Sequence, residues 1–368
     1  MAETVLANPR NEILEDQVEA VSRPACLMCG SAGWMLYEGL RDRPFNTPGL
    51  WNLKRCPNRG CGLLWLDPMP SPNDVWKAYR TYYTHAGASD TLLQQDLARR
   101  LFRQTIAMLR KAYLNRKYSY YLDEGTSAVL LGWLAYLMPW RRSEWDISVM
   151  FLPRIQGGRL LEVGSGAGHL LHELLQLGWE VEGIDVDGAA VENARAKGLK
   201  ASLGTLENLH FPDNHFDAVC MSHVIEHVHD PARLLQECHR ILKPGGRLSL
   251  ITPNAQSLCH RMFGSSWFAL EPPRHLHIFT RSTMQRILSE AGFNAANVFT
   301  TIRDADALFV ASRSIRSSGR FTMHSKQPRS EKIAGRIIQI LEWALLKVTS
   351  SAGEELSVIA HKQSGSKN

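Results

Sequence analysis

The chain has 368 residues, enough for two domains or for one large domain with an appendage, and for a sizeable hydrophobic core. Hydrophobic residues make up 44% of it and charged residues 21%, a composition that excludes a collagen, a coiled coil and a largely disordered chain. The net charge of +6 is modest for this length, but basic residues cluster locally, which indicates either an acidic partner surface or a solvated helix face. This cluster is Arg99, Arg100, Arg103, Arg110, Lys111, Arg116 and Lys117.

The first residues do not resemble a secretory signal. Segment 1–23 is polar and acidic and lacks a basic start followed by an apolar run, so we expect a cytoplasmic protein. The longest uncharged apolar stretch, 125–140, has 16 residues, fewer than the roughly 20 that cross a bilayer. We therefore expect no transmembrane helix, and peripheral contact with the inner face of the membrane stays open.

Four of the seven cysteines fall early in the chain, in two pairs. Cys26 and Cys29 are separated by two residues, and Cys56 and Cys61 by four. An odd cysteine count in a protein expected in the cytoplasm disfavours a disulfide framework. Because four thiolates can complete a closed tetrahedral site, we predict structural zinc in an amino-terminal zinc-knuckle module of residues 1–83. Unmetallated thiols are the alternative.

A helical segment, 84–152, and an α/β domain, 153–368, are expected to follow. Apolar runs alternate with helical patterns in that domain, which favours parallel strands joined by helices. The expected strands are 159–163, 180–184, 216–222, 246–252 and 355–361, and the expected helices are 169–177, 188–197, 231–242 and 331–348. We expect the last helix to pack its apolar face on the domain, with a membrane or partner surface as the alternative. The stretch 312–329, rich in Ser and Arg, is expected to be a loop or disordered.

A glycine-rich loop follows the first strand of this domain. Gly164, Gly166 and Gly168 allow a tight turn and a close approach of backbone to a ligand. His169 stands where a dinucleotide fingerprint has its third glycine, which disfavours NAD. Asp185 ends the next strand, where a carboxylate can accept hydrogen bonds from both hydroxyls of a ribose. The pattern predicts a nucleoside site, and a glycine-rich turn with a solvated aspartate is the alternative.

Five ordered blocks resemble the class I S-adenosylmethionine (SAM)-dependent methyltransferases. They are Glu162 to Gly168, Asp185, Phe211 to Asp217, His223 to Val228 and Leu242 to Gly246. The resemblance, over about 157–300, implies a Rossmann-like, doubly wound sheet of seven strands whose last strand is antiparallel. It also implies that Glu162 and the glycine loop hold the methionine part of SAM, that Asp185 holds the ribose, and that Thr205 and Leu206 flank adenine. The full set predicted to bind the cofactor is Glu162, Gly164, Ser165, Gly166, Gly168, Asp185, Val186, Thr205, Leu206 and His223. Relatives often have Asp where this chain has Thr205, so backbone groups are expected to recognise adenine here.

The stretch 267–279 combines aromatic residues, prolines, an arginine and two histidines, and is suited to form a substrate lid. His275 is the candidate general base, because a neutral imidazole can take up a proton near pH 7. His223, which follows a strand at the edge where ligands bind in open α/β sheets, is the second catalytic candidate, and a helix-cap or core histidine is the alternative. In the alternative interpretation His275 only fixes the loop through a backbone hydrogen bond.

The cysteine module, together with 63–70 and 79–83, resembles the zinc-binding amino-terminal segment of methyltransferases from sugar and polysaccharide pathways. This resemblance implies methyl transfer to a small-molecule or glycoconjugate acceptor: a sugar, a nucleotide-sugar or a lipid-linked glycan. An RNA- or protein-directed methyltransferase with nucleic-acid-binding zinc knuckles is one alternative, disfavoured by the modest net charge. A nicotinamide-dependent oxidoreductase is the other, disfavoured by the missing third glycine. The oligomeric state stays open.

Overall fold

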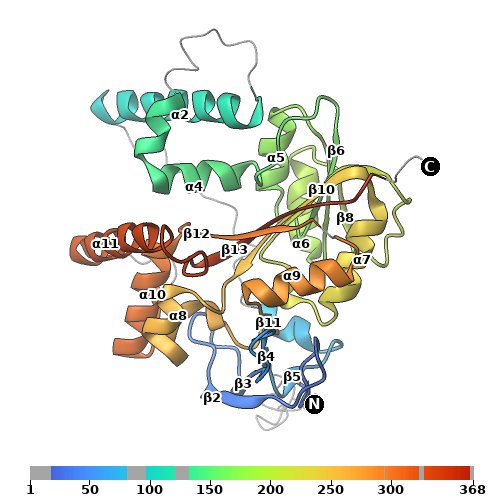
Figure 1. Cartoon of the computed structure of the whole chain (residues 1–368), viewed down its shortest axis with the longest axis vertical. Coiled ribbons are helices and arrows are strands. Elements are labelled where there is room, and N and C mark those ends of the chain that lie inside the picture. Colours follow the sequence, from blue (N-terminus) through green and yellow to red (C-terminus); the bar gives the residue numbers. More distant parts are fainter. Residues whose placement is uncertain (1–17, 81–96, 121–131, 294, 323–326, 365–368) are drawn as a thin grey trace, which may run out of the picture.

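A seven-stranded mixed sheet forms the centre of the computed structural model, which describes residues 18–80, 97–120, 132–293, 295–322 and 327–364 (Figure 1). The strand order is β12-β13-β10-β9-β6-β7-β8. The bounds are β6 Arg159–Val163, β7 Glu180–Asp185, β8 Ala201–Leu203, β9 Phe216–Ser222, β10 Leu242–Pro253, β12 Asn297–Thr301 and β13 Glu355–His361. Strands β6 to β10 pair in parallel, and β13 runs antiparallel to both of its neighbours. The predicted sheet with an antiparallel last strand is confirmed.

Several helices of the α/β domain begin at polar residues that cap them. Asp187 accepts from two backbone N–H groups at the start of α6, Gly188–Ala196, and Asp230 accepts from Arg233 at the start of α7, Pro231–Ile241. These side chains satisfy N–H groups that have no partner inside a helix. Further helices here are α5 His169–Gln176, η4 Ile225–His227, α8 Leu258–Phe263, η5 Gly264–Ser266 and α9 Arg281–Glu290. The predicted helices 169–177, 188–197 and 231–242 are confirmed to within one residue.

Both faces of the sheet are buried, as the continuous apolar runs in its strands require. On β9, Ala218 and Cys220 pack on the side of α5, α6 and the helical segment. Val219 and Met221 pack on the opposite side, with α7, α9 and the cysteine module. The amino-terminal module and the helical segment therefore cover opposite faces of the fold (Figure 1).

The amino-terminal module is a small β structure whose main sheet includes one strand of the α/β domain. Its elements are β1 Ala20–Val21, β2 Trp34–Leu40, β3 Trp51–Arg55, β4 Leu64–Leu66, β5 Met69–Pro70 and the 3₁₀ helix η1 Val75–Tyr79. The four-stranded sheet has the order β11-β4-β3-β2, and β11, His277–Ile278, comes from the stretch predicted to be a lid. That stretch also contains η6, Phe268–Leu270. It is therefore an ordered connection between the two parts, not a free loop.

The helical segment consists of α2 Leu97–Tyr118, η3 Ala135–Leu137 and α4 Pro139–Ser148. Buried Asp146 fixes α4 to α2, because its Oδ1 atom accepts from the hydroxyls of Tyr113 and Tyr118 and from Lys117 Nζ. Arg110 of the predicted basic cluster pairs with Glu173 of α5, so part of that cluster faces the domain. The side chains of Arg99 and Arg100, and residues 125–131 of the apolar stretch 125–140, lie outside the described residues. Among the residues described, no helix is long and apolar enough to cross a membrane.

Two expectations for the carboxyl-terminal third are wrong. Part of the predicted loop 312–329 is helical, because α10, Ala305–Ser318, buries Phe309 and Ile315, and its Ser312 accepts a hydrogen bond from the backbone of Phe268. The second concerns α11, Arg329–Leu345, which forms where a helix was expected but turns most of its apolar stripe outward. A Cβ at Gly335 would lie 2.6 Å from the carbonyl oxygen of Asp306, so only glycine allows this close packing of α11 on α10. Helix α11 therefore packs on α10 through the face that contains Gly335, and not through the face that contains the isoleucines.

Candidate active site and metal centre

The glycine loop between β6 and α5 has a backbone that side chains could not adopt without strain. Gly164, Gly166 and Gly168 have φ values of +72°, +50° and +75°. A Cβ at Gly164 would come within 2.4 Å of Val224, and one at Gly168 within 2.4 Å of Leu199. At Gly166 an added Cβ would meet no atom within 4 Å. Both ends of the loop are therefore held in close contact with neighbouring side chains, and its middle leaves space for a ligand.

Three strand ends meet at this loop. The backbone N–H groups of Gly164 and Ser165 donate to the carbonyl of Ile184, at 2.8 and 3.0 Å. The Asp185 carboxylate accepts from Gly166 N at 2.7 Å, and the Asp185 carbonyl accepts from Gly204 N at 2.9 Å. The structure thus brings the ends of β6, β7 and β8 together, and with them most of the residues predicted to bind the cofactor.

Two buried polar atoms here lack a partner among the described residues. They are Glu162 Oε2 and Ser165 Oγ, on side chains that are 5% and 6% exposed. Burial, with the charge of Asp185, raises the pKa of the Glu162 carboxyl. Buried polar groups are ordinarily hydrogen-bonded, so these atoms fit a ligand that brings donors to the open loop. The ammonium group of the methionine part of SAM is such a donor.

The residues predicted to bind ribose and those predicted to bind adenine offer different hydrogen-bonding groups. Asp185 already accepts from two backbone N–H groups, but each carboxylate oxygen can accept more than one hydrogen bond, so it can still receive ribose hydroxyls. Val186 is 73% exposed beside it. The Leu206 side chain is buried in the core, which leaves its backbone, together with exposed Thr205, for adenine.

His223 follows β9 and bridges two buried carboxylates. Its Nδ1 lies 3.1 Å from Glu226 Oε1, and its Nε2 lies 3.0 Å from Glu355 Oε1. Burial lowers the pKa of His223, but hydrogen bonds and charge from both glutamates outweigh burial and raise it to about 10. An imidazolium that donates from both nitrogens has no lone pair with which to accept a proton. This geometry favours a fixed positive charge at His223 over the role of a base.

His275 has the opposite electrostatics. It is 4% exposed, and burial lowers its pKa to about 4. Its Nδ1 lies 2.8 Å from the carbonyl oxygen of Ala269, which can only accept, so Nδ1 carries the hydrogen and Nε2 keeps a lone pair. The hydrogen bond that fixes the loop therefore also prepares Nε2 as a proton acceptor.

His227 lies beside His275, with 4.8 Å between the ring centroids. Burial, followed by the proximity of His275, lowers the pKa of His227 to about 4. Its Nδ1 lies 2.9 Å from the Arg274 carbonyl and 3.0 Å from the hydroxyl of Tyr79. Glu226, His227 and His275 each offer a potential metal ligand atom within 4.8 Å of the others. Two neutral imidazoles thus share one wall of the site with the ionised Glu226.

The amino-terminal module builds part of this wall through Arg274. The guanidinium is fully buried and makes two hydrogen bonds of 2.8 Å with the carboxylate of Asp42. It also donates to Glu271 Oε1 at 2.9 Å and to the Ala78 carbonyl at 3.1 Å, and it stacks on Phe45. This contact is not predictable from the sequence, because no local pattern links two residues 232 positions apart.

The four predicted cysteine ligands form one cluster. The Sγ atoms of Cys26 and Cys61 are 3.7 Å apart and those of Cys29 and Cys56 are 3.4 Å apart, and all four lie within 4.8 Å of one another. With Zn–S bonds of about 2.3 Å, a tetrahedral site places its sulfur atoms about 3.8 Å apart, so the cluster fits zinc. Thr280 at the start of α9 donates to the Cys61 carbonyl at 2.7 Å, which ties the cluster to the α/β domain.

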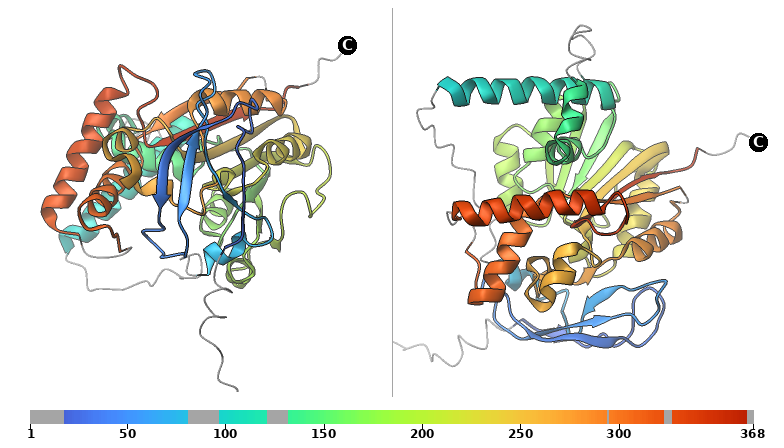
Figure 2. Two further views of the ribbon diagram at one scale, coloured as in Figure 1. Left: turned by 90° about the horizontal axis from the view of Figure 1, so that it is seen from below. Right: turned by 60° about the vertical axis from the view of Figure 1, so that its left-hand side comes forward.

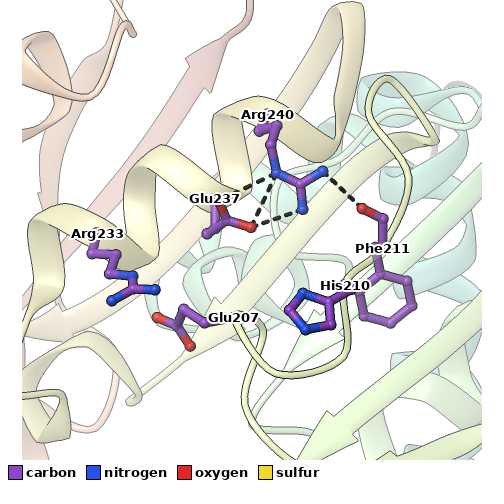
Figure 3. A pocket seen from close by; sticks show the side chains of 6 residues that line it. All are labelled: Glu207, His210, Phe211, Arg233, Glu237 and Arg240. Atoms are coloured by element: carbon purple, nitrogen blue, oxygen red, sulfur yellow. Dashed lines mark hydrogen bonds and ion pairs between the residues drawn. The ribbon is translucent and has the colours of Figure 1, made fainter.

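A separate surface pocket lies on α7 and the loop before β9 (Figure 3). It is lined by Glu207, His210, Phe211, Arg233, Glu237 and Arg240. Arg240 is engaged by Glu237 at 2.8 Å and by the Phe211 carbonyl at 2.8 Å, and Figure 3 shows Glu207 and Arg233 pointing toward each other. None of the predicted cofactor or catalytic residues lines it, so we do not assign the reaction to it.

Comparison with known proteins agrees with the site. Residues 139–298 match the family model of a methyltransferase domain. A ubiquinone biosynthesis O-methyltransferase of Alkalilimnicola ehrlichii is 33% identical over 141 residues, which cover 36% of this chain and 57% of that protein. Its counterpart from Xanthomonas oryzae pv. oryzae is 35% identical over 132 residues, which cover 33% and 55%.

The chain thus spans little more than half the length of these curated relatives. Among solved structures, an S-adenosylmethionine-dependent methyltransferase from Mesorhizobium loti aligns with a TM-score of 0.42 at 21% identity, covering 60% of this chain and 97% of that one. The predicted glycine loop and Asp185 both fall inside the matched segment. Residues 139–298 are therefore similar to a methyltransferase domain.

Proposed function

We propose that this protein methylates a hydroxyl group of a small-molecule acceptor, with SAM as donor and His275 as the general base. The observation that carries the proposal is the lone pair on His275 Nε2, set by the hydrogen bond from Nδ1 to the Ala269 carbonyl. A chain of contacts ties this imidazole to the cofactor loop. Leu276 N donates to the carbonyl of Glu226 in η4 at 2.8 Å, and Val224, which immediately precedes η4, packs on Gly164. The matched relatives are named O-methyltransferases.

Each part of the site has a distinct task. Glu162, Ser165 and the glycine loop would hold the methionine part of SAM, and Asp185 its ribose. Bound SAM supplies an electrophilic methyl group. Nε2 of His275 would take up the hydroxyl proton of the acceptor, an effect of about 10²–10⁴-fold for a positioned base. The imidazolium of His223 and the carboxylates around it would fix the wall against which the acceptor is oriented.

For the acceptor we propose two classes that the experiment separates. A sugar, a nucleotide-sugar or a lipid-linked glycan is supported by the resemblance of the cysteine module to sugar-pathway methyltransferases. A hydroxylated aromatic ring is supported by the names of the relatives. Incubation of the full chain with SAM and acceptors of both classes, followed by mass spectrometry for the gain of one methyl group, identifies the class. His275→Ala should reduce that gain at least a hundredfold. Unchanged turnover in that variant would remove the assigned base.

We further propose that Cys26, Cys29, Cys56 and Cys61 bind one structural zinc ion. All four positions of the tetrahedron are filled by thiolates, so the ion would have no open position for catalysis. Elemental analysis of the purified protein should give one zinc per chain. Cys61→Ser should lose the metal, whereas Cys238→Ser, which alters a buried thiol of α7, should keep it. A metal-free wild-type chain with full stability would contradict the proposal.

A further inference from the structure

Helix α11 buries the polar side chains of Gln339 and Glu342, packs Ile338 partly against the core, and turns most of its large apolar side chains outward. Its inner residues make specific hydrogen bonds: Gln339 Nε2 donates to the Ile302 carbonyl at 2.9 Å, and Glu342 Oε1 accepts from Glu354 N at 3.0 Å. The outward side chains are apolar. They are Ile333, Ile337, Ile340 and Leu341, with exposed fractions of 62%, 52%, 46% and 54%. The fold thus holds the helix by its polar face and leaves the apolar face without a covering layer among the described residues.

The outward residues form one continuous stripe. Positions separated by three, four or seven residues lie on the same side of a helix, as Ile333, Ile337 and Ile340 do. Figure 2 shows α11 on the outside of the molecule, in front of the rest of the fold in its right-hand view. Single exposed apolar residues are common, but a contiguous apolar stripe marks an interaction surface.

The charges beside this stripe are positive. Arg329, Lys332 and Lys347 are exposed along α11 and the turn that follows it, and Lys347 lies 5.3 Å from the ring of Trp343. The two acidic residues of α11 are not free: Glu342 is buried, and Glu331 pairs with Arg313 of α10. The stripe is therefore bordered by cations that no neighbouring exposed carboxylate of α11 balances.

We infer that the exposed face of α11 docks on a membrane surface that contains anionic lipids. A helix with an apolar stripe, flanking lysine and arginine, and a tryptophan at its edge lies in the plane of the interface, with the stripe between headgroups and acyl chains. The basic border is complementary to anionic headgroups. A second copy of the chain seated on the same face would instead bring two sets of these cations together, which is unfavourable.

The docked face is directly connected to the proposed acceptor side of the active site. Glu342, on the inner side of α11, holds the backbone of Glu354, and the next residue, Glu355, contacts His223. Membrane docking would thus place the wall around His223 near the bilayer, where a lipid-linked acceptor lies. Only this last step rests on the proposed function, because lipid binding is measured without acceptor or turnover.

Flotation of the full chain with two kinds of vesicle tests the inference. The vesicles contain phosphatidylcholine alone, or phosphatidylcholine with phosphatidylglycerol. Wild-type protein should bind the anionic vesicles, and binding should weaken at high salt. The double variant Ile337→Ser with Leu341→Ser should bind at least tenfold less. Leu50→Ser, a matched loss of an exposed leucine on the amino-terminal module, should bind like the wild type.

Two further measurements keep the test decisive. The double variant Arg329→Glu with Lys332→Glu should lose binding to the anionic vesicles. All variants should keep the wild-type unfolding temperature and the wild-type affinity for SAM, because the changed side chains are exposed. The inference is overturned if wild-type protein ignores anionic vesicles, or if the double serine variant binds them unchanged. It is also overturned if light scattering shows a dimer that the double serine variant dissociates, because a second copy would then cover the stripe.

Discussion

Replacing Asp42 by Asn should destabilise the protein far more than the loss of an ordinary ion pair. Both side chains of the Asp42–Arg274 pair are fully buried and joined by two hydrogen bonds of 2.8 Å. Removing one member of a buried pair leaves an uncompensated charge and costs about 3–5 kcal/mol. The amide keeps the shape of the carboxylate, and Glu271 still faces the guanidinium, so we expect about 3 kcal/mol, the lower end of that range.

Chemical unfolding, followed by tryptophan fluorescence, measures this loss against a matched control. Glu290→Gln removes the exposed partner of Arg286 on α9 and should change the free energy of unfolding far less than Asp42→Asn does, because solvent screens an exposed ion pair. If Asp42→Asn costs no more than this control, the buried pair does not hold the amino-terminal module to the His275 loop.

The same pair makes a prediction for pH. Burial raises the pKa of Asp42, but the hydrogen bonds and charge of Arg274 outweigh burial and leave it below its usual value. A carboxyl with a lowered folded-state pKa adds stability above its unfolded pKa and loses it as the pH falls through the folded value. The difference in stability between the wild type and Asp42→Asn should therefore be full at pH 7 and shrink below about pH 4. A difference that stays constant down to pH 3 would contradict the assignment.

Three other predictions concern the site. His275→Gln should lower kcat about 10²–10⁴-fold with little change in the dissociation constant of SAM. In the wild type, kcat/KM should fall as the pH approaches 4, where the imidazole of His275 becomes protonated. A fall of kcat/KM centred near pH 6.5 would show that another group, and not His275, must lose its proton for the reaction. Glu355→Gln removes one of the two carboxylates that raise the pKa of His223, so NMR titration should find that pKa closer to its usual value, and an unchanged value would show that Glu226 alone sets it. Treatment with a strong zinc chelator should lower the unfolding temperature of the wild type. An unchanged unfolding temperature in a protein that has lost its metal would contradict a structural role for the ion.

The sequence predicted those features whose signals are local. The glycine loop and Asp185 lie within 22 residues, and each has a chemical requirement that can be recognised from its neighbours. The last strand, 355–361, was predicted with its observed bounds, since seven mostly apolar residues leave few alternatives. The four cysteines converge as their spacing suggested.

The features that escaped prediction depend on contacts between distant segments. Asp42 and Arg274 meet only after the module docks, and β11 has two residues, too few for any periodicity. The face of α11 was expected inward because its isoleucines follow a helical period, but periodicity does not say which side a neighbour can approach. Gly335 decides that question, because it alone allows α10 to come so close. The serines of 312–318 favour a loop by composition, whereas Ser312 lies buried in α10 and accepts a hydrogen bond from the backbone N–H of Phe268.

Isothermal titration calorimetry with SAM tests the central claim, that the glycine loop, Glu162 and Asp185 hold this cofactor. The wild-type chain should bind one SAM molecule, and Asp185→Ala should bind at least tenfold more weakly, because the ribose hydroxyls lose their acceptor. Asp187→Ala, which changes the neighbouring helix cap and not the cradle, should bind SAM almost as the wild type does. A wild-type chain with no measurable affinity for SAM, or an Asp185→Ala variant with undiminished affinity, would contradict the account.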